Sequence, residues 1–171
     1  MFDIINKETI KLDQVGRGDI FIKFASDWAG RGIVLGQAIT NYFTRIGDPN
    51  YWKYPGTSLL SHAAIYVGDA MIAEAVGSGV KQNSIRYGVN QHEVYHVFHC
   101  KDREVASLAE ECSKGVINKA DYDLLSALFS FGRFDDLVRS DITKSMKEKM
   151  EKGEHVKFFC SEFVTYCYNV A

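Results

Sequence analysis

Proline, long apolar runs and excess charge of one sign are all scarce in this sequence. Only two prolines, Pro49 and Pro55, occur among 171 residues, and no run of 18 apolar residues is present. A membrane-crossing helix needs a run of about that length, so we expect no transmembrane segment. The formal net charge of −2 and the pI near 6.2 give no basic surface of the kind that binds nucleic acid.

The first residues also lack a secretion signal. Residues 1–17 are polar and mixed in charge, without the apolar stretch of a signal peptide. We therefore expect a cytoplasmic protein, or one that a signal-independent secretion system exports to act in the periplasm, unless a leader has been removed.

The four cysteines follow neither a disulfide nor a zinc pattern. None stands in a C-x-x-C pair, and four in a chain of this length are too few for a disulfide scaffold. Free cysteines are usually buried as small hydrophobic residues, which we expect of Cys100, Cys112 and Cys167. We predict no cofactor and no metal site, because the nearby His92, His96 and His99 do not converge on one face.

What is present suits one ordinary domain covering residues 1–171. Hydrophobic residues make up 46% of the chain and aromatic residues 13%, enough for a core. Apolar periodicity predicts strands over 18–24, 62–67, 71–75, 79–87 and 93–100, and helices over 33–44, 102–118, 124–131, 144–150 and 160–171. The predicted fold class is α+β, with an antiparallel sheet packed by helices.

In the helix over 102–118, one face is expected to be apolar and buried. The residues on this predicted face are Val105, Leu108, Ala109, Cys112 and Val116.

Cys160 opens the last predicted helix, directly after the extended run 156–159. A thiol at a helix N-terminus feels the positive end of the aligned peptide dipoles, which lowers its pKa and favours the nucleophilic thiolate. The Cys160 backbone N–H would also be placed to donate to an oxyanion. The position alone is a weak sign of function, because free cysteine is so often simply buried.

His62 is the candidate base, since a strand can hold an imidazole rigidly against a thiol. Glu74, in the next strand, is the candidate third member, which would orient the imidazole and stabilise its charged form. Read as ordinary structure, the first is a half-buried histidine and the second an exposed glutamate.

Pairing of Glu74 with His62 requires a particular hairpin. With a three-residue loop over 68–70, Val67 faces Met71, Tyr66 faces Ile72 and Ala64 faces Glu74, so that Glu74 is the diagonal neighbour of His62. A two-residue loop would put Glu74 on the opposite face. The hypothesis therefore demands a three-residue loop, which a bulge can accompany.

Other polar and aromatic residues are weaker candidates. His155 is an alternative base, but it lies in a Gly-Glu-His stretch that has the composition of a loop. Asp19 is expected to close a turn. Side chains that would line the site or fill the core are Tyr66, Trp28, Tyr51 and Trp52.

In this order, the motifs resemble the circularly permuted NlpC-type, papain-like cysteine peptidases, in particular their bacterial YiiX-like branch. The resemblance rests on Gly18-Asp19-Ile20, on segment 61–80 with His62 and Glu74, and on Cys160-Ser161-Glu162-Phe163-Val164. Lecithin:retinol acyltransferase-like enzymes are related, but usually carry a second histidine where Glu74 stands. The stretches 25–57 and 120–155 match nothing in the pattern.

The resemblance implies a permuted papain-like fold and a cysteine peptidase or amidase, with Cys160 as nucleophile, His62 as base and Glu74 as orienting residue. It further implies an amide in bacterial cell-wall (peptidoglycan) peptides as substrate. Some similar enzymes are antibacterial effectors, for which an immunity protein would be the partner. Two alternatives stay open: a lipid acyltransferase or thioesterase-type enzyme using the same Cys–His site, and an inactive binding module that keeps the fold.

Overall fold

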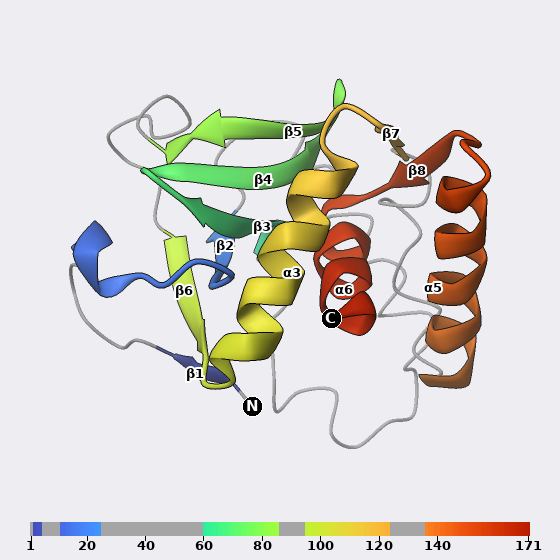
Figure 1. Cartoon of the computed structure of the whole chain (residues 1–171). Coiled ribbons are helices and arrows are strands. Elements are labelled where there is room, and N and C mark those ends of the chain that lie inside the picture. The colour runs from blue at the N-terminus through green and yellow to red at the C-terminus, as the bar shows by residue number, and fades with distance from the viewer. Residues whose placement is uncertain (1, 5–10, 25–59, 86–94, 124–135) are drawn as a thin grey trace, which may run out of the picture.

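The computed structural model describes residues 2–4, 11–24, 60–85, 95–123 and 136–171, which form an α+β fold (Figure 1). Its strands are β1 (Phe2–Ile4), β2 (Ile20–Phe24), β3 (Leu60–Gly68), β4 (Met71–Val76), β5 (Gly79–Ser84), β6 (Tyr95–Cys100), β7 (Ala120–Tyr122) and β8 (Val156–Phe158). Its helices are the short 3-10 turn η1 (Leu12–Gln14), α3 (Arg103–Val116), α5 (Asp136–Glu151) and α6 (Cys160–Val170).

One antiparallel sheet organises the molecule, with the strand order β1-β6-β2-β3-β4-β5, while β7 and β8 pair separately and in parallel. The predicted α+β class is confirmed. None of the helices in the described part of the chain is long and apolar enough to cross a membrane.

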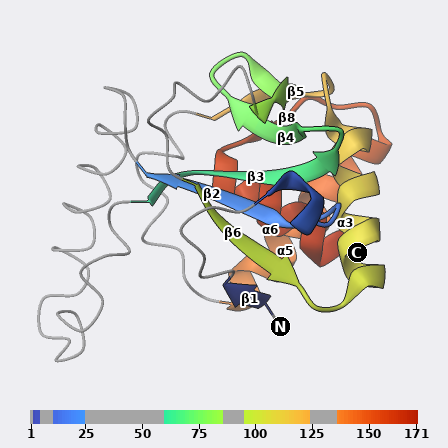
Figure 2. The same ribbon diagram turned by 90° about the vertical axis from the view of Figure 1, so that its left-hand side faces the viewer.

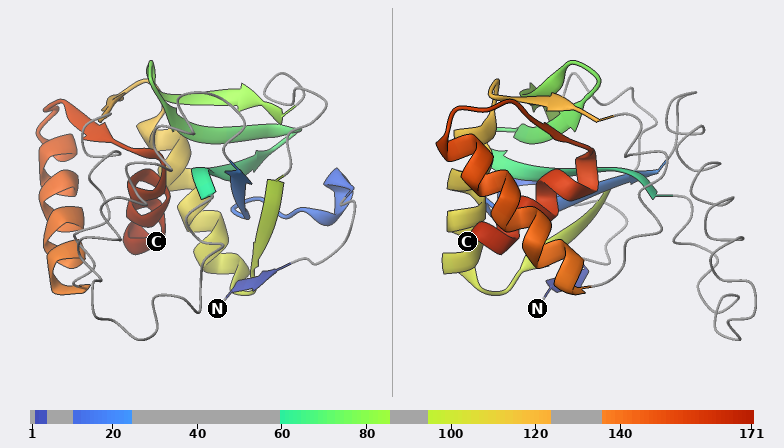
Figure 3. Two further views of the ribbon diagram at one scale, coloured as in Figure 1. Left: turned by 180° about the vertical axis from the view of Figure 1, so that it is seen from behind. Right: turned by 90° about the vertical axis from the view of Figure 1, so that its right-hand side faces the viewer.

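Helices α3 and α6 cover one face of the sheet (Figures 1 and 2). The strands offer small side chains there, such as Ala63 and Ala73, which let the helices lie close to the backbone. From the helix side, Phe163 fills the space between the layers and packs edge-on against Phe158 of β8, with ring centroids 6.1 Å apart. Helix α5 lies beyond α6, on the side away from α3 (Figure 3).

The other face of the sheet carries a second apolar cluster. Phe21 of β2 stacks on Tyr66 of β3, with centroids 5.8 Å apart, and Ile72 and Val97 join them. The central strand β3 is therefore buried on both faces, which makes it a rigid support for His62.

The predicted buried face of α3 was partly wrong. The buried residues are Ala106, Ala109, Glu110, Ser113 and Val116, whereas Leu108 is 42% exposed. Small side chains on this face let α3 pack closely on α6, so the bulky Leu108 is turned outward. The Glu110 carboxylate is neutralised by Lys114 and by Arg17 at 3.5 Å.

The β3–β4 hairpin has a shorter loop than predicted, but it keeps Glu74 on the predicted face of the sheet. Ala64 opposes Glu74 and Tyr66 opposes Ile72 as predicted, but Gly68, not Val67, opposes Met71. The loop is the two residues Asp69 and Ala70, both in the left-handed region at φ 53° and 59°, as in a type I′ turn. The three-residue loop was wrong. A bulge between Tyr66 and Gly68 supplies the extra residue that keeps Glu74 on the His62 face.

Several other predictions can be compared with the structure. Helix α5 is much longer than the predicted 144–150, and the three-residue strands β1 and β7 were not predicted. The predicted helices over 33–44 and 124–131 lie outside the described residues.

Candidate active site

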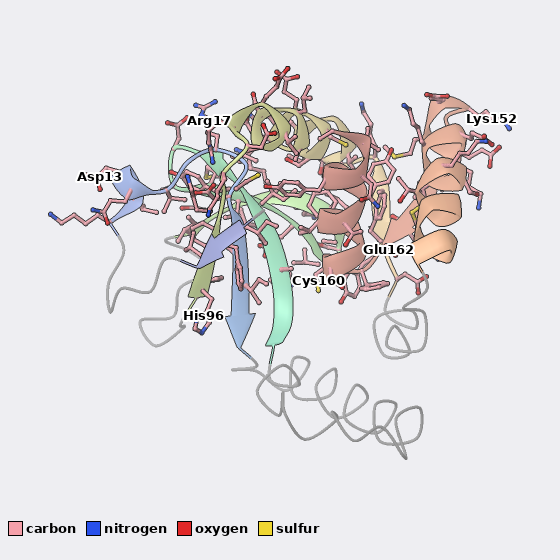
Figure 4. The ribbon with its side chains drawn as sticks, turned by 90° about the horizontal axis from the view of Figure 1, so that it is seen from below. Asp13, Arg17, His96, Lys152, Cys160 and Glu162 are labelled. Atoms are coloured by element: carbon pink, nitrogen blue, oxygen red, sulfur yellow. The ribbon has the colours of Figure 1, made fainter. Side chains whose placement is uncertain are left out.

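Cys160 stands at the first position of α6, after a sharp change from the extended backbone of β8. Its N-cap is Phe159, whose side chain does not cap the helix. The side chain of Cys160 is buried, at the end of α6 that lies beside β3 (Figure 4). This placement brings the sulfur of residue 160 to the strand that carries residue 62.

The pairing of β3 with β4 stops short of Ala63, and Cys160 contacts the β3 backbone at that residue. Pairing between β3 and β4 ends at Ala64–Glu74, although β3 continues back to Leu60 and β4 runs on to Val76. The Cys160 sulfur accepts hydrogen bonds from the backbone N–H groups of Ala63 and Ser161. The N–H of a strand residue points sideways, in the plane of the sheet. The sulfur therefore lies beside the β3 backbone, where the side chain of the neighbouring His62 reaches it.

The three predicted residues lie in a row. The His62 imidazole hydrogen bonds to the Cys160 thiol, and its Nε2 lies 2.5 Å from Oε2 of Glu74. Asn83 of β5 donates from Nδ2 to the other oxygen of Glu74, Oε1, at 2.8 Å. Since Nε2 faces the carboxylate, Nδ1 is the ring nitrogen left to face the sulfur.

Opposing effects set the pKa of His62. Burial disfavours the charged imidazolium, but hydrogen bonds and charge interactions with Cys160 and Glu74 outweigh it and raise the pKa of His62 to about 10. The imidazole therefore holds its proton at neutral pH.

The partners of His62 shift in the opposite direction. Burial favours the neutral thiol, yet His62 and the N–H groups of Ala63 and Ser161 lower the pKa of Cys160. Burial likewise acts against the carboxylate, and His62 and Asn83 nevertheless lower the pKa of Glu74. The arrangement favours a thiolate–imidazolium–carboxylate array, the charge state of an activated cysteine nucleophile.

Tyr122 lies near this array and was missed by the sequence reasoning. Burial, with the nearby Cys160 and Asp123, raises the pKa of Tyr122 to about 12, so the phenol stays neutral and able to donate a hydrogen bond. Strand β7 sets Tyr122 opposite Phe158, two residues before Cys160. A strand of three residues is too short to be predicted from apolar periodicity, so the sequence did not indicate that Tyr122 lies near Cys160.

The weaker candidates lie elsewhere. His155 is exposed and pairs with Asp121, with Nδ1 3.5 Å from Oδ2. Tyr66 packs in the second apolar cluster, and its hydroxyl accepts from the Ala70 N–H at 3.4 Å. His99 contacts Asp19.

Within the described ranges, no group of three or more His, Cys, Asp or Glu side chains is placed to hold a metal ion. Among the other candidates, those outside the described residues are His92, Trp28, Tyr51 and Trp52.

Comparison with known proteins gives a distant relative. The chain is similar to the "Probable lipoprotein peptidase YaeF" of Escherichia coli (strain K12), with 26% identity over 125 residues. The matched region covers 64% of this chain and 46% of the relative, so the chain spans less than half of that protein's length. No protein-family profile and no solved structure matches the chain. The similarity favours a peptidase-like chemistry.

Proposed function

We propose that this chain is a cysteine hydrolase that cleaves an amide bond. The proposal is carried by one observation: the His62 imidazole lies between the Cys160 thiol and the Glu74 carboxylate, and contacts both. A base that touches both the nucleophile and an orienting carboxylate is the arrangement that nucleophilic catalysis needs. The similarity to a protein named as a peptidase supports the same class of reaction.

The first half of the reaction forms an acyl-enzyme. The Cys160 thiolate attacks the carbonyl carbon, forming a C–S bond while the carbonyl electron pair moves onto oxygen. The Cys160 backbone N–H, at the first position of α6, would stabilise this oxyanion. The His62 imidazolium then gives its proton to the leaving nitrogen as the C–N bond breaks.

The second half restores the enzyme. Neutral His62 takes a proton from water, whose oxygen attacks the thioester and displaces the sulfur. A carboxylic acid leaves, and Cys160 and His62 return to their charged pair. Glu74 remains ionised throughout and holds the imidazole in the orientation that serves both steps.

For the substrate, we propose an amide in a bacterial cell-wall peptide. The motif order around His62, Glu74 and Cys160, which resembles that of the permuted NlpC-type peptidases, supports this choice, and so does a glutamate in place of a second histidine at position 74. On this proposal the protein acts in the periplasm as an antibacterial effector, and an immunity protein would be its partner.

Digestion of purified cell-wall sacculi tests the proposal. The wild-type chain should release soluble fragments whose masses show one hydrolysed amide bond, Cys160→Ala should release none, and Cys112→Ala, which changes a cysteine outside the site, should match the wild type. Transfer of acyl groups from a phospholipid vesicle, with intact sacculi, would replace the peptidase proposal by the acyltransferase alternative. Inertness on both substrates, with a slow-reacting Cys160, would favour the binding module.

A further inference from the structure

Two other cysteines meet between the helices that cover the sheet. Cys112 lies on α3 and Cys167 on α6, and each thiol is close enough to the other to shift its pKa. Both belong to the apolar cluster that joins these helices to the sheet. Sequence patterns do not pair them, because 55 positions separate them and the quoted motifs include neither.

Close packing of the two helices brings these cysteines near each other. The neighbouring buried residues of α3 are small, with Ala109 one turn before Cys112 and Ser113 beside it, and both are fully buried. Helices α3 and α6 therefore approach closely. A disulfide needs Cβ atoms about 4 Å apart, which requires closely packed backbones; rotation about χ1 can then bring the two sulfurs together.

The two thiols differ in their exposure to solvent and in the charges near them. Cys167 is fully buried, whereas Cys112 is partly exposed and lies near Lys147 of α5. The contact with Cys167, together with the charge of Lys147, lowers the pKa of Cys112. Burial, with the contact to Cys112, raises the pKa of Cys167. Cys112 is thus the thiol that would react first with a small oxidant.

We propose that Cys112 and Cys167 are a redox modification site, at which a peroxide-class oxidant forms an intramolecular disulfide that ties α3 to α6. The Cys112 thiolate attacks one oxygen of hydrogen peroxide, the O–O bond breaks, and Cys112 becomes a sulfenic acid while hydroxide leaves. The Cys167 sulfur then attacks the Cys112 sulfur, its proton passes to the departing hydroxyl, and water leaves. Two thiols and one peroxide thus give one disulfide and two waters.

The crosslink would act on the helix that carries the proposed nucleophile. Cys167 follows Cys160 by seven residues on α6, about 10 Å along the helix axis. The disulfide would fasten α6 to α3 without touching the His62 contact. It also closes a long loop of chain, which restricts the unfolded state and raises the temperature of unfolding.

The test uses the full chain with Cys160→Ala, so that the proposed nucleophile does not consume oxidant. After treatment with hydrogen peroxide and alkylation of free thiols, digestion without reductant should yield a crosslinked peptide pair containing Cys112 and Cys167. Tm should rise by roughly 5 °C or more, and a reductant should reverse both changes. Cys112→Ser in the same background should abolish both. A second background, Cys160→Ser, repeats the measurement with a side chain closer in size to cysteine.

Recovery of both cysteines alkylated, or of Cys112 overoxidised with Cys167 still free, would overturn the proposal. So would a crosslink between two copies of the chain, or one that joins Cys112 to Cys100. The site is independent of the proposed hydrolase: the crosslink can form in a chain that leaves sacculi intact, and hydrolysis can proceed in Cys112→Ser.

Discussion

At the scale of single residues, the charge state of His62 depends on a contest between burial and partners. Burial acts against the imidazolium, and the Cys160 and Glu74 contacts more than compensate. Removal of either partner should therefore lower the pKa of His62 and favour the neutral imidazole. Where Glu74 is the partner removed, the neutral thiol of Cys160 is favoured as well. The pair and its carboxylate act as one unit.

Glu74→Gln tests this coupling. The amide keeps the size of the side chain but loses the charge that favours imidazolium, so the pKa of His62 should fall and the thiolate fraction of Cys160 with it. We expect kcat/KM on the proposed cell-wall peptide substrate to drop roughly 10- to 10³-fold, with the acid limb of the pH–rate profile moved to higher pH.

Asn83→Ala is the matched control, because Asn83 reaches His62 only through Glu74. Its loss should be smaller and should move the profile less. Equal activities for Glu74→Gln and the wild type would remove Glu74 from the proposed site.

The residue-scale contacts show the limits of prediction from sequence. His62 and Cys160 are 98 positions apart, and only the resemblance to a known motif order brought them together. The register of Glu74 against Ala64 was predicted correctly, but from a three-residue loop that is not there; strand alternation alone allows two registers, and the bulge between Tyr66 and Gly68 decides between them. Tyr122 and the Cys112–Cys167 contact depend on how β7 and α6 pack, which no local pattern reveals.

At the scale of elements, the β3–β4 turn carries stored strain. Ala70 has φ 59°, a left-handed conformation that costs a residue with a Cβ about 1 kcal/mol or more. The two-residue loop keeps Ala70 in this conformation. Together with the bulge in β3, that loop decides on which face of the sheet Glu74 lies.

Ala70→Gly should relieve this strain. We expect the free energy of unfolding to rise by about 0.5–1 kcal/mol, since the greater freedom of glycine in the unfolded chain offsets part of the gain. Urea unfolding followed by circular dichroism measures it. The control Ala73→Gly, in extended and buried backbone, should lose stability. A loss of stability in Ala70→Gly would contradict the turn described here.

Helices and strands were predicted correctly where a regular apolar pattern extends over many residues. Helices α3 and α6 and strands β3 to β6 were expected near their observed ranges, and the antiparallel α+β class followed from their order. The exposed side of α3 was misjudged, because periodicity identifies apolar positions but not which of them fit a closely packed neighbour. Leu108 is the example.

At the scale of the whole molecule, Asp19 ties together parts of the chain far apart in sequence. Its fully buried carboxylate accepts from the Gly16 N–H at 2.8 Å, His99 Nδ1 at 3.0 Å, the Cys100 N–H at 3.3 Å and Arg103 Nη1 at 2.8 Å. The expected turn is present, and the same side chain also joins the end of β6 to the start of α3.

Asp19→Ala should therefore destabilise the whole fold, because Arg103 loses its buried partner and several N–H groups lose their acceptor. We expect a loss of at least about 2 kcal/mol in the free energy of unfolding, measured by chemical denaturation. Asp13→Ala, at an exposed position of η1, should change stability by no more than about 0.5 kcal/mol. A loss for Asp19→Ala as small as that of Asp13→Ala would show that the cluster does not hold these segments together.

The pairing of Cys160 with His62 underlies the proposed chemistry, and the alkylation rate of Cys160 by iodoacetamide, followed from about pH 5 to about pH 9, reports on it. Because His62 lowers the pKa of Cys160, the wild-type thiol should react rapidly at neutral pH and lose reactivity only as the pH falls through that lowered pKa. In His62→Ala the curve should move up toward the ordinary thiol pKa, with the rate near neutral pH reduced roughly tenfold or more. Superimposable curves for the two proteins, or a wild-type Cys160 as slow as Cys100, would contradict the pairing.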